Sequence, residues 1–169
     1  INGADDSRFT HRYNSSNIDE IEGQEFDLLV SAGFSAVKWQ ANQHKEDDWK
    51  SIESLLKHFE SVRAKKFILI STVDVYPSPV GVDEDELIEG VPNEPYGENR
   101  LLAESHVRER FADHLIVRLP ALFGKGLKKN VLFDLLSANQ LESINPQNTY
   151  QYYDLSRIWE DLQKCLDNG

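Results

Sequence analysis

FILISTVDVY, residues 67–76, is the stretch of this sequence that decides its fold. Its first four residues, Phe67 to Ile70, are all apolar, which is typical of a strand in a parallel sheet that is covered on both faces. The strand then ends in two hydroxyl side chains, those of Ser71 and Thr72. Because ligands bind beyond the carboxyl ends of the strands in open parallel sheets, these two residues lie at a predicted binding edge.

Two further apolar runs predict neighbouring strands of the same sheet. Residues 26–30 read FDLLV, and residues 114–119 read HLIVRL. The residues that follow these runs are Ser31, Ala32, Gly33, Pro120 and Ala121. Since the carboxyl ends of parallel strands meet at one edge of a sheet, we expect all three strand ends to line a single crevice.

Helical patterns separate the predicted strands. Apolar residues recur at spacings of three and four over residues 47–64, which predicts an amphipathic helix. A second helix is expected over residues 96–111. Its inner face is expected to carry Leu101, Leu102, Val107 and Phe111. Short strands are expected at residues 9–13 and 150–153, helices at 131–136 and 155–166, and a long surface loop at 77–95.

Strands and helices therefore alternate along the chain. This order predicts an α/β protein, built as a Rossmann-like parallel sheet with helices on both faces. A length of 169 residues fits a single domain with a substantial core, so we expect one domain over residues 1–169.

The composition argues against several kinds of partner. A net charge of −11 disfavours nucleic acid, because affinity for a phosphate backbone rests on Lys and Arg, and it disfavours an anionic membrane surface as well. No apolar run approaches the roughly 20 residues that span a bilayer. Cys165 is the single cysteine, so no internal disulfide is possible, and no metal site is expected. We expect a cytoplasmic protein that binds a small molecule.

Tyr96 and Arg100 are the most informative polar residues. A helix that begins there places them on one face, one turn apart. A nearby cation stabilises the phenolate and lowers a tyrosine pKa that is otherwise ~10. A hydroxyl such as that of Thr72 can hydrogen-bond the same substrate oxygen and orient a carbonyl or alcohol for hydride transfer. The three residues could form a proton-transfer site; alternatively, Tyr96 only caps and packs its helix.

Several segments, taken in order, resemble the extended short-chain dehydrogenase/reductase superfamily, in its NAD-dependent epimerase/dehydratase branch. The similarity lies in residues 26–33, in FILISTVDVY, in YGENRLLAE at 96–104, in IVRLPALFGKG at 116–126 and in QYYDL at 151–155. It covers about residues 24–165. It implies an epimerase, dehydratase or reductase that uses NAD or NADP on a nucleotide sugar, and a homodimer as the possible assembly.

The resemblance also implies roles for individual residues. Thr72 would be the hydroxyl donor, and Tyr96 would be the acid/base. Asp74 would be a second acid/base group, although a solvated or turn-forming aspartate explains it equally well. Arg100 stands where the family has lysine and would contact Tyr96 and the nicotinamide ribose. The cofactor-binding residues would be Ser31, Ala32, Gly33, Ser71, Tyr96, Arg100, Pro120 and Ala121.

Two features depart from the family pattern. Arginine keeps the charge of the usual lysine but is broader and stays protonated. The glycine-rich loop that normally holds the pyrophosphate is absent, since Gly3 is the only glycine before Gly23. We therefore expect a sheet truncated at its N-terminus, with residues 125–150 as the remnant of a substrate-binding part. Both departures leave open a second reading, a non-catalytic Rossmann-like binding or regulatory module.

Overall fold

The computed structural model describes residues 9–78, 80–83, 88, 90–127 and 130–168 of the chain. These residues form two compact units, which are described separately. The first unit spans His11–Arg118. The second comprises the chain from Leu119 onward, together with Phe9 and Thr10.

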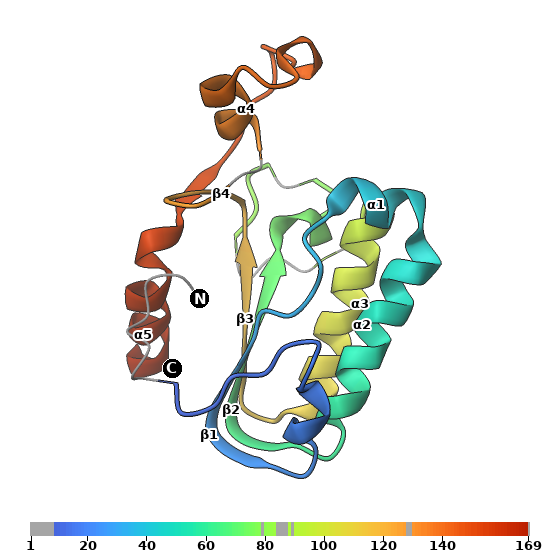
Figure 1. Ribbon diagram of the computed structural model, residues 1–169, viewed down its shortest axis with the longest axis vertical. Helices are drawn as coiled ribbons and strands as arrows, with labels where there is room; N and C mark the ends of the chain where they lie inside the picture. Colours follow the sequence, from blue (N-terminus) through green and yellow to red (C-terminus); the bar gives the residue numbers. More distant parts are fainter. Residues whose placement is uncertain (1–8, 79, 84–87, 89, 128–129, 169) are drawn as a thin grey trace. The chain divides into compact units, whose positions relative to one another are not determined.

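A three-stranded sheet forms the centre of the first unit, in the order β1-β2-β3. The strands are β1 (Glu25–Ser31), β2 (Arg63–Thr72) and β3 (His114–Leu119), whose last residue lies at the boundary between the units. β1 and β2 are parallel, in a register that runs from Glu25 opposite Arg63 to Ser31 opposite Leu69. The arrows of β2 and β3 point the same way in Figure 1. The predicted parallel α/β sheet is therefore confirmed.

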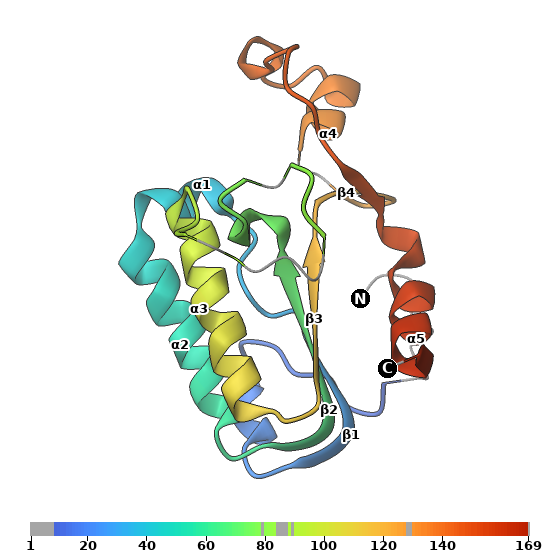
Figure 2. The ribbon, with the colours of Figure 1, turned by 180° about the vertical axis from the view of Figure 1, so that it is seen from behind.

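Two helices, α2 (Lys45–Phe59) and α3 (Pro95–Arg110), lie side by side on one face of this sheet (Figures 1 and 2). Acidic residues fill the first turn of α2, and arginines fill the last turn of α3, so each end carries charges that suit the helix dipole. The remaining elements of this unit are short: η2 (Ile18–Ile21), α1 (Lys38–Gln43) and η3 (Val73–Val75).

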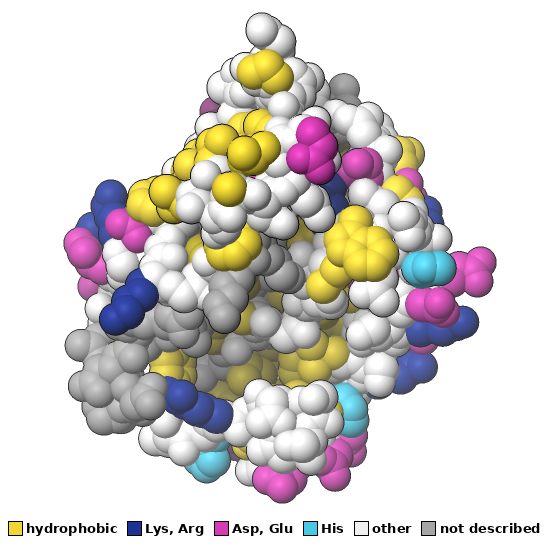
Figure 3. Space-filling model, turned by 45° about the horizontal axis from the view of Figure 1, so that its top comes forward, with side chains coloured by type: hydrophobic (Ala, Val, Ile, Leu, Met, Phe, Trp, Pro, Cys, Tyr) yellow, Lys and Arg dark blue, Asp and Glu magenta, His cyan; other side chains and the backbone are white. Residues whose placement is uncertain are grey.

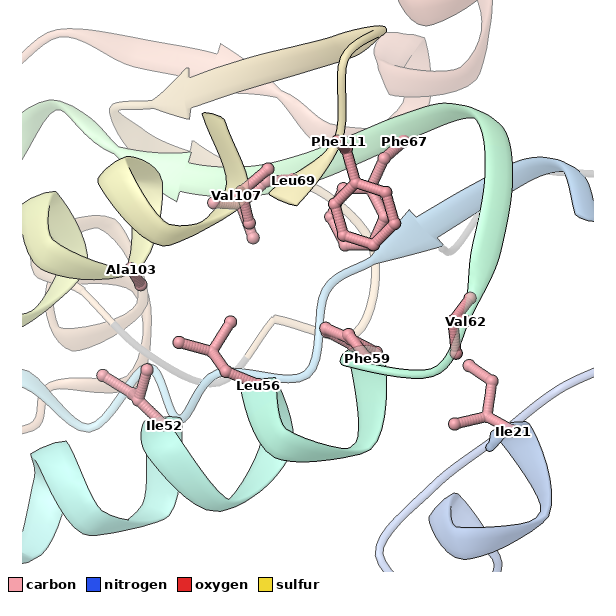
Figure 4. Close-up of a cluster of buried hydrophobic side chains, with 10 residues drawn as sticks. All are labelled: Ile21, Ile52, Leu56, Phe59, Val62, Phe67, Leu69, Ala103, Val107 and Phe111. Carbon is pink, nitrogen blue, oxygen red and sulfur yellow. The ribbon is translucent and has the colours of Figure 1, made fainter. Parts of the chain in front are cut away.

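An apolar core lies between the sheet and the two helices (Figure 4). Its members are Ile21, Ile52, Leu56, Phe59, Val62, Phe67, Leu69, Ala103, Val107 and Phe111. Phe67 of β2 stacks on Phe111, with ring centroids 4.1 Å apart, and meets the edge of Phe59 at 5.4 Å. The apolar run that predicted the strand thus supplies the centre of the core.

The structure corrects several boundaries. Residues 9–13 form no strand. α2 ends at Phe59, not near residue 64, because the chain turns there and enters β2 at Arg63. Helix α1 was not expected. Leu102 is 52% exposed, so it does not belong to the inner face of α3. That face carries polar residues instead, which are described with the candidate site.

The second unit contains a short parallel pair, β4 (Ala121–Phe123) and β5 (Tyr152–Asp154). It also contains the helical segments α4 (Val131–Ser137), η4 (Leu141–Ser143), η5 (Leu155–Arg157) and α5 (Ile158–Asn168). The Asn130 side chain caps α4 by accepting hydrogen bonds from the amides of Leu132 and Phe133. Hydrophobic side chains are exposed on the surface in Figure 3, and Leu135 and Leu136 of α4 are among the exposed apolar residues.

Candidate active site

Thr72 and Asp74 form a compact pair where β2 ends and η3 begins. Thr72 is 8% exposed, and its hydroxyl donates a hydrogen bond to Asp74 Oδ2 at 3.1 Å. The same hydroxyl accepts from the Asp74 amide at 3.2 Å, so Thr72 acts as the N-cap of η3. Asp74 is therefore both turn-forming, as one reading of the sequence allowed, and directly bonded to the hydroxyl of Thr72.

The first turn of α3, which carries Tyr96, lies close to Asp74 of η3. Pro95 occupies the start of the helix, where its missing N–H costs nothing. The Tyr96 amide donates to Asn42 Oδ1 at 2.9 Å, which ties the helix start to α1. Gly97 allows the helix to approach η3 closely, because a Cβ there would lie 2.0 Å from the Asp74 carbonyl oxygen.

Arg100 lies one turn further along α3, as predicted. Its guanidinium carbon is 4.2 Å from the centroid of the Tyr96 ring, a distance suited to a cation–π contact. The group is buried, with 2% of the residue exposed. Asp48 forms a bidentate ion pair with it: Oδ2 accepts from Nη1 at 2.5 Å, and Oδ1 accepts from Nη2 at 3.1 Å. Nη2 also donates to the Ser35 carbonyl at 2.5 Å.

This geometry changes the interpretation of Arg100. Its positive charge is compensated by Asp48, a carboxylate of α2 that the sequence reasoning did not single out. Both terminal nitrogens are bonded to protein groups inside the fold. The predicted hydrogen bonds from Arg100 to a nicotinamide ribose would require this buried cluster to open.

The pKa of Tyr96 moves in the direction opposite to the one expected. Burial is the largest effect and raises the pKa of the phenol above 10.0. The charge of Arg100 lowers the pKa, but the charges of Asp74 and Asp48 raise it again. The net result is a tyrosine that holds its proton more firmly at neutral pH than a free one does.

Lys38 is a charged neighbour that the sequence reasoning missed. Its Nζ lies 2.9 Å from Asp74 Oδ1 and 2.6 Å from Glu94 Oε2. Burial acts to lower the pKa of Lys38, but the hydrogen bonds and charges of Glu94 and Asp74 outweigh it and raise the pKa. No local pattern marks this lysine, because its partners lie 36 and more residues further along the chain.

Ser71 faces a different network. Its hydroxyl donates to Glu104 Oε1 at 2.6 Å, and Glu104 is fully buried. Arg118 and Arg108 both donate to Glu104 Oε2, at 2.7 Å and 3.1 Å. Arg118 also donates to the hydroxyl of Tyr76 at 2.6 Å. The Ser71 hydroxyl proton is thus engaged with α3, and the cofactor contact that the sequence suggested for Ser71 stays a prediction.

The remaining predicted cofactor residues fall into two groups. Ser31 ends β1 and is 6% exposed, whereas Ala32 and Gly33 follow it and are exposed. A Cβ on Gly33 would lie 2.8 Å from Leu55 Cδ2, so a glycine suits the packing there. Pro120 and Ala121 belong to the second unit, where Ala121 pairs with Tyr152. Their part in the same site stays a prediction.

Among the residues that the structure describes, no three His, Cys, Asp or Glu side chains are grouped so that they could hold a metal ion. None of the described helices is both long and apolar enough to cross a membrane.

A parallel sheet with helices α2 and α3 packed on one face, and with Thr72 at the carboxyl end of its central strand, defines a Rossmann-like α/β protein. The sequence matches the model of the NAD dependent epimerase/dehydratase family over residues 9–151. The chain belongs to this family. A comparison with curated protein sequences found no match.

Solved structures share the fold. A dTDP-4-dehydrorhamnose reductase from Clostridium acetobutylicum superposes with a TM-score of 0.67 at 16% identity, covering 84% of this chain and 52% of that one. A UDP-glucuronic acid 4-epimerase variant from Bacillus cereus, in complex with a fluorinated UDP-sugar and NAD, gives 0.63 at 17% identity, covering 90% and 53%. The UDP-glucose 4-epimerase of Thermotoga maritima, with UDP-glucose, gives 0.61 at 15% identity, covering 83% and 52%. The chain spans about half the length of these proteins.

Proposed function

We propose that the protein is an NAD(P)-dependent epimerase, dehydratase or reductase that acts on a nucleotide sugar. Family membership supports this proposal, as do structural neighbours described as binding UDP-glucuronic acid analogues, UDP-glucose and NAD. The observation that carries it is the position of Tyr96 on the first turn of α3, which approaches Asp74 of η3 closely at Gly97.

The residues at the strand ends fit the nicotinamide part of such a cofactor. Ala32 and Gly33 are small and exposed, so the backbone after β1 can be approached closely by a flat ring. Tyr96 is only half-buried. These residues would hold the nicotinamide end, and the bound cofactor would supply the hydride acceptor or donor. Arg100 is not among its contacts, because its guanidinium is bonded to Asp48 and Ser35.

Tyr96 would act as the proton donor in the reductive direction. Its raised pKa keeps the phenol protonated at neutral pH, ready to give a proton to a sugar oxygen as that oxygen gains negative charge. Thr72 would orient the same oxygen. The hydroxyl proton of Thr72 is directed at Asp74. In this orientation the Thr72 oxygen can accept a hydrogen bond from a substrate hydroxyl, whereas the Thr72 hydroxyl must rotate before it can donate to a substrate carbonyl.

Cofactor titration and one substitution test this proposal. Binding of NADH or NADPH is followed by fluorescence and calorimetry. If neither cofactor binds at millimolar concentration, the proposed oxidoreductase function is refuted. We expect Tyr96→Phe to reduce turnover by about 10²–10⁴-fold with cofactor affinity nearly unchanged. Tyr150→Phe, at a tyrosine that is 41% exposed, is the matched control and should leave turnover unchanged. Equal turnover of Tyr96→Phe and the wild type would refute the role of the phenol.

A second candidate is a non-catalytic binding or regulatory module of the same fold. The raised pKa of Tyr96 favours it, because burial of the phenol outweighs the opposing charge of Arg100 and so disfavours the phenolate. This candidate predicts cofactor or nucleotide-sugar binding with no turnover under any condition in which the wild type stays folded. Detectable turnover that Tyr96→Phe abolishes would exclude it.

A further inference from the structure

An ion-pair cluster centred on Lys38 lies next to the Thr72–Asp74 pair. Lys38 is the first residue of α1, Asp74 lies in η3, and Glu94 is the N-cap of α3. The single ammonium group therefore joins three segments that are distant in sequence, through contacts of 2.9 Å and 2.6 Å. Its side chain is 44% exposed, so the cluster reaches from solvent to the edge of the candidate site.

The two oxygens of the Asp74 carboxylate have different partners. Oδ2 accepts from the Thr72 hydroxyl at 3.1 Å, and Oδ1 accepts from Lys38 Nζ at 2.9 Å. A carboxylate held from both sides loses the freedom to rotate, and so does the hydroxyl that it binds. Lys38 thereby restricts the direction in which the Thr72 proton points.

The charges around Tyr96 give Lys38 a second effect. The charge of Arg100 lowers the pKa of Tyr96, whereas the charges of Asp74 and, less strongly, Asp48 raise it. Lys38 is the cation bonded to Asp74. Removing it would leave the Asp74 charge without this partner beside Tyr96. Glu94, the other carboxylate bound by Lys38, would lose the same partner.

We propose that Lys38 is the positioning residue of this site, which holds Asp74 against Thr72 and offsets the negative charge near Tyr96. Arg100 still acts directly on the phenol, and Lys38 acts on the opposing charge of Asp74. The consequence for catalysis rests on the proposed function, whereas the consequences for Asp74 and Tyr96 do not.

The first test is amide hydrogen exchange of the cofactor-free chain at neutral pH. Lys38→Met should speed exchange of the Asp74 amide, which donates to Thr72, by about fivefold or more, because the turn is no longer held from outside. Lys38→Arg should stay near the wild type. Lys45→Met is the matched control, since Lys45 is 47% exposed and pairs with Glu98 of α3. Unchanged exchange in Lys38→Met, or equal acceleration in Lys45→Met, would overturn the positioning role.

The second test is the ionisation of the Tyr96 phenol, followed by carbon-13 NMR of labelled tyrosine and identified with Tyr96→Phe. Lys38→Met should raise the pKa of Tyr96, and Asp74→Asn should lower it, because the two substitutions change the local charge in opposite senses. Circular dichroism at each pH monitors the fold. A shift of the same sign in both variants contradicts the charge argument.

Turnover separates this inference from the proposed function. With NAD and UDP-glucose as probes, Lys38→Met should lower kcat about tenfold at nearly constant KM, with partial rescue by Lys38→Arg. A wild-type chain that binds no cofactor ends the proposed function, while exchange and phenol ionisation still decide the role of Lys38. A wild-type chain that turns over at the same rate as Lys38→Met ends the inference and leaves the proposed function intact.

Discussion

We expect replacement of Arg100 to lower the free energy of unfolding, whatever its effect on catalysis. The guanidinium is 2% exposed and donates three hydrogen bonds, two to Asp48 and one to the Ser35 carbonyl. Arg100→Met leaves the Asp48 carboxylate, itself 8% exposed, without its counter-charge. Breaking a buried ion pair from one side costs about 3–5 kcal/mol, so we expect a loss of that size in the free energy of unfolding.

Arg100→Lys, which restores the usual family residue, should also destabilise the chain. A lysine ammonium is a compact point charge and cannot reproduce the planar fork that meets both oxygens of Asp48. At least one buried acceptor, Ser35 O or an Asp48 oxygen, loses its partner, at a cost of about 1–3 kcal/mol. This milder variant keeps the test usable if Arg100→Met does not fold.

Urea unfolding, followed by circular dichroism, measures these losses. The double variant Arg100→Met/Asp48→Leu removes both charges and should cost far less than the sum of the two single changes. Arg63→Met is the control, because the Arg63–Glu25 pair is largely exposed and is worth about 0–1 kcal/mol. The reasoning is wrong if Arg100→Lys unfolds at the urea midpoint of the wild type, or if the single losses simply add.

Three other predictions follow from the same contacts. Gly97→Ala should lower the free energy of unfolding, measured in urea, by about 1–3 kcal/mol. The new Cβ would lie 2.0 Å from the Asp74 carbonyl oxygen, and this clash outweighs the better helix propensity of alanine. Unaltered stability would contradict that close contact. Glu104→Gln should cost about 3–5 kcal/mol, since two arginines lose their buried partner, whereas Glu109→Gln on the exposed face of α3 should be neutral. Burial raises the pKa of Tyr96, so the unfolded chain loses the phenol proton at lower pH than the folded chain does. The contribution of this group to the free energy of unfolding is therefore fully present below pH 10.0 and is lost as the pH rises further. Tyr96→Phe should flatten the alkaline fall in stability, and an identical fall in the variant would show that the pKa of Tyr96 is not raised.

Strand and helix identity could be predicted from the sequence because the responsible signals are local. The run Phe67–Ile70 is apolar at every position, and Phe67, Ile68 and Leu69 are buried at the centre of β2. Tyr96 and Arg100 are four residues apart in a helix, so their contact follows from helix geometry alone, and the 4.2 Å distance confirms it.

The partners of the site residues could not be predicted, because they are set by packing between distant segments. Asp48 lies 52 residues before Arg100, and Lys38 lies 36 residues before Asp74. Acidic residues are common at the start of a helix, where they suit the dipole, so the first turn of α2 gave no sign that one of them is buried. The apolar pattern of α3 was misleading as well, since Leu102 is exposed.

The inner face of α3 explains why. Gly97, Arg100 and Glu104 follow one another at spacings of three and four, and all three are buried. Each meets a different part of the first unit: η3 for Gly97, α2 and the segment after β1 for Arg100, β2 and β3 for Glu104. Directional polar contacts of this kind fix the orientation of a helix about its own axis more strictly than apolar packing alone does.

The same arrangement separates the two tasks that one basic residue was expected to perform. Arg100 keeps the contact with Tyr96 and lowers its pKa, while its terminal nitrogens hold α3 to α2 through Asp48. A basic residue four positions after the tyrosine therefore does not distinguish an enzyme from a binding module in this chain. The charge of Asp74 next to Tyr96 is the other influence on the phenol, and Lys38 is bonded to that carboxylate.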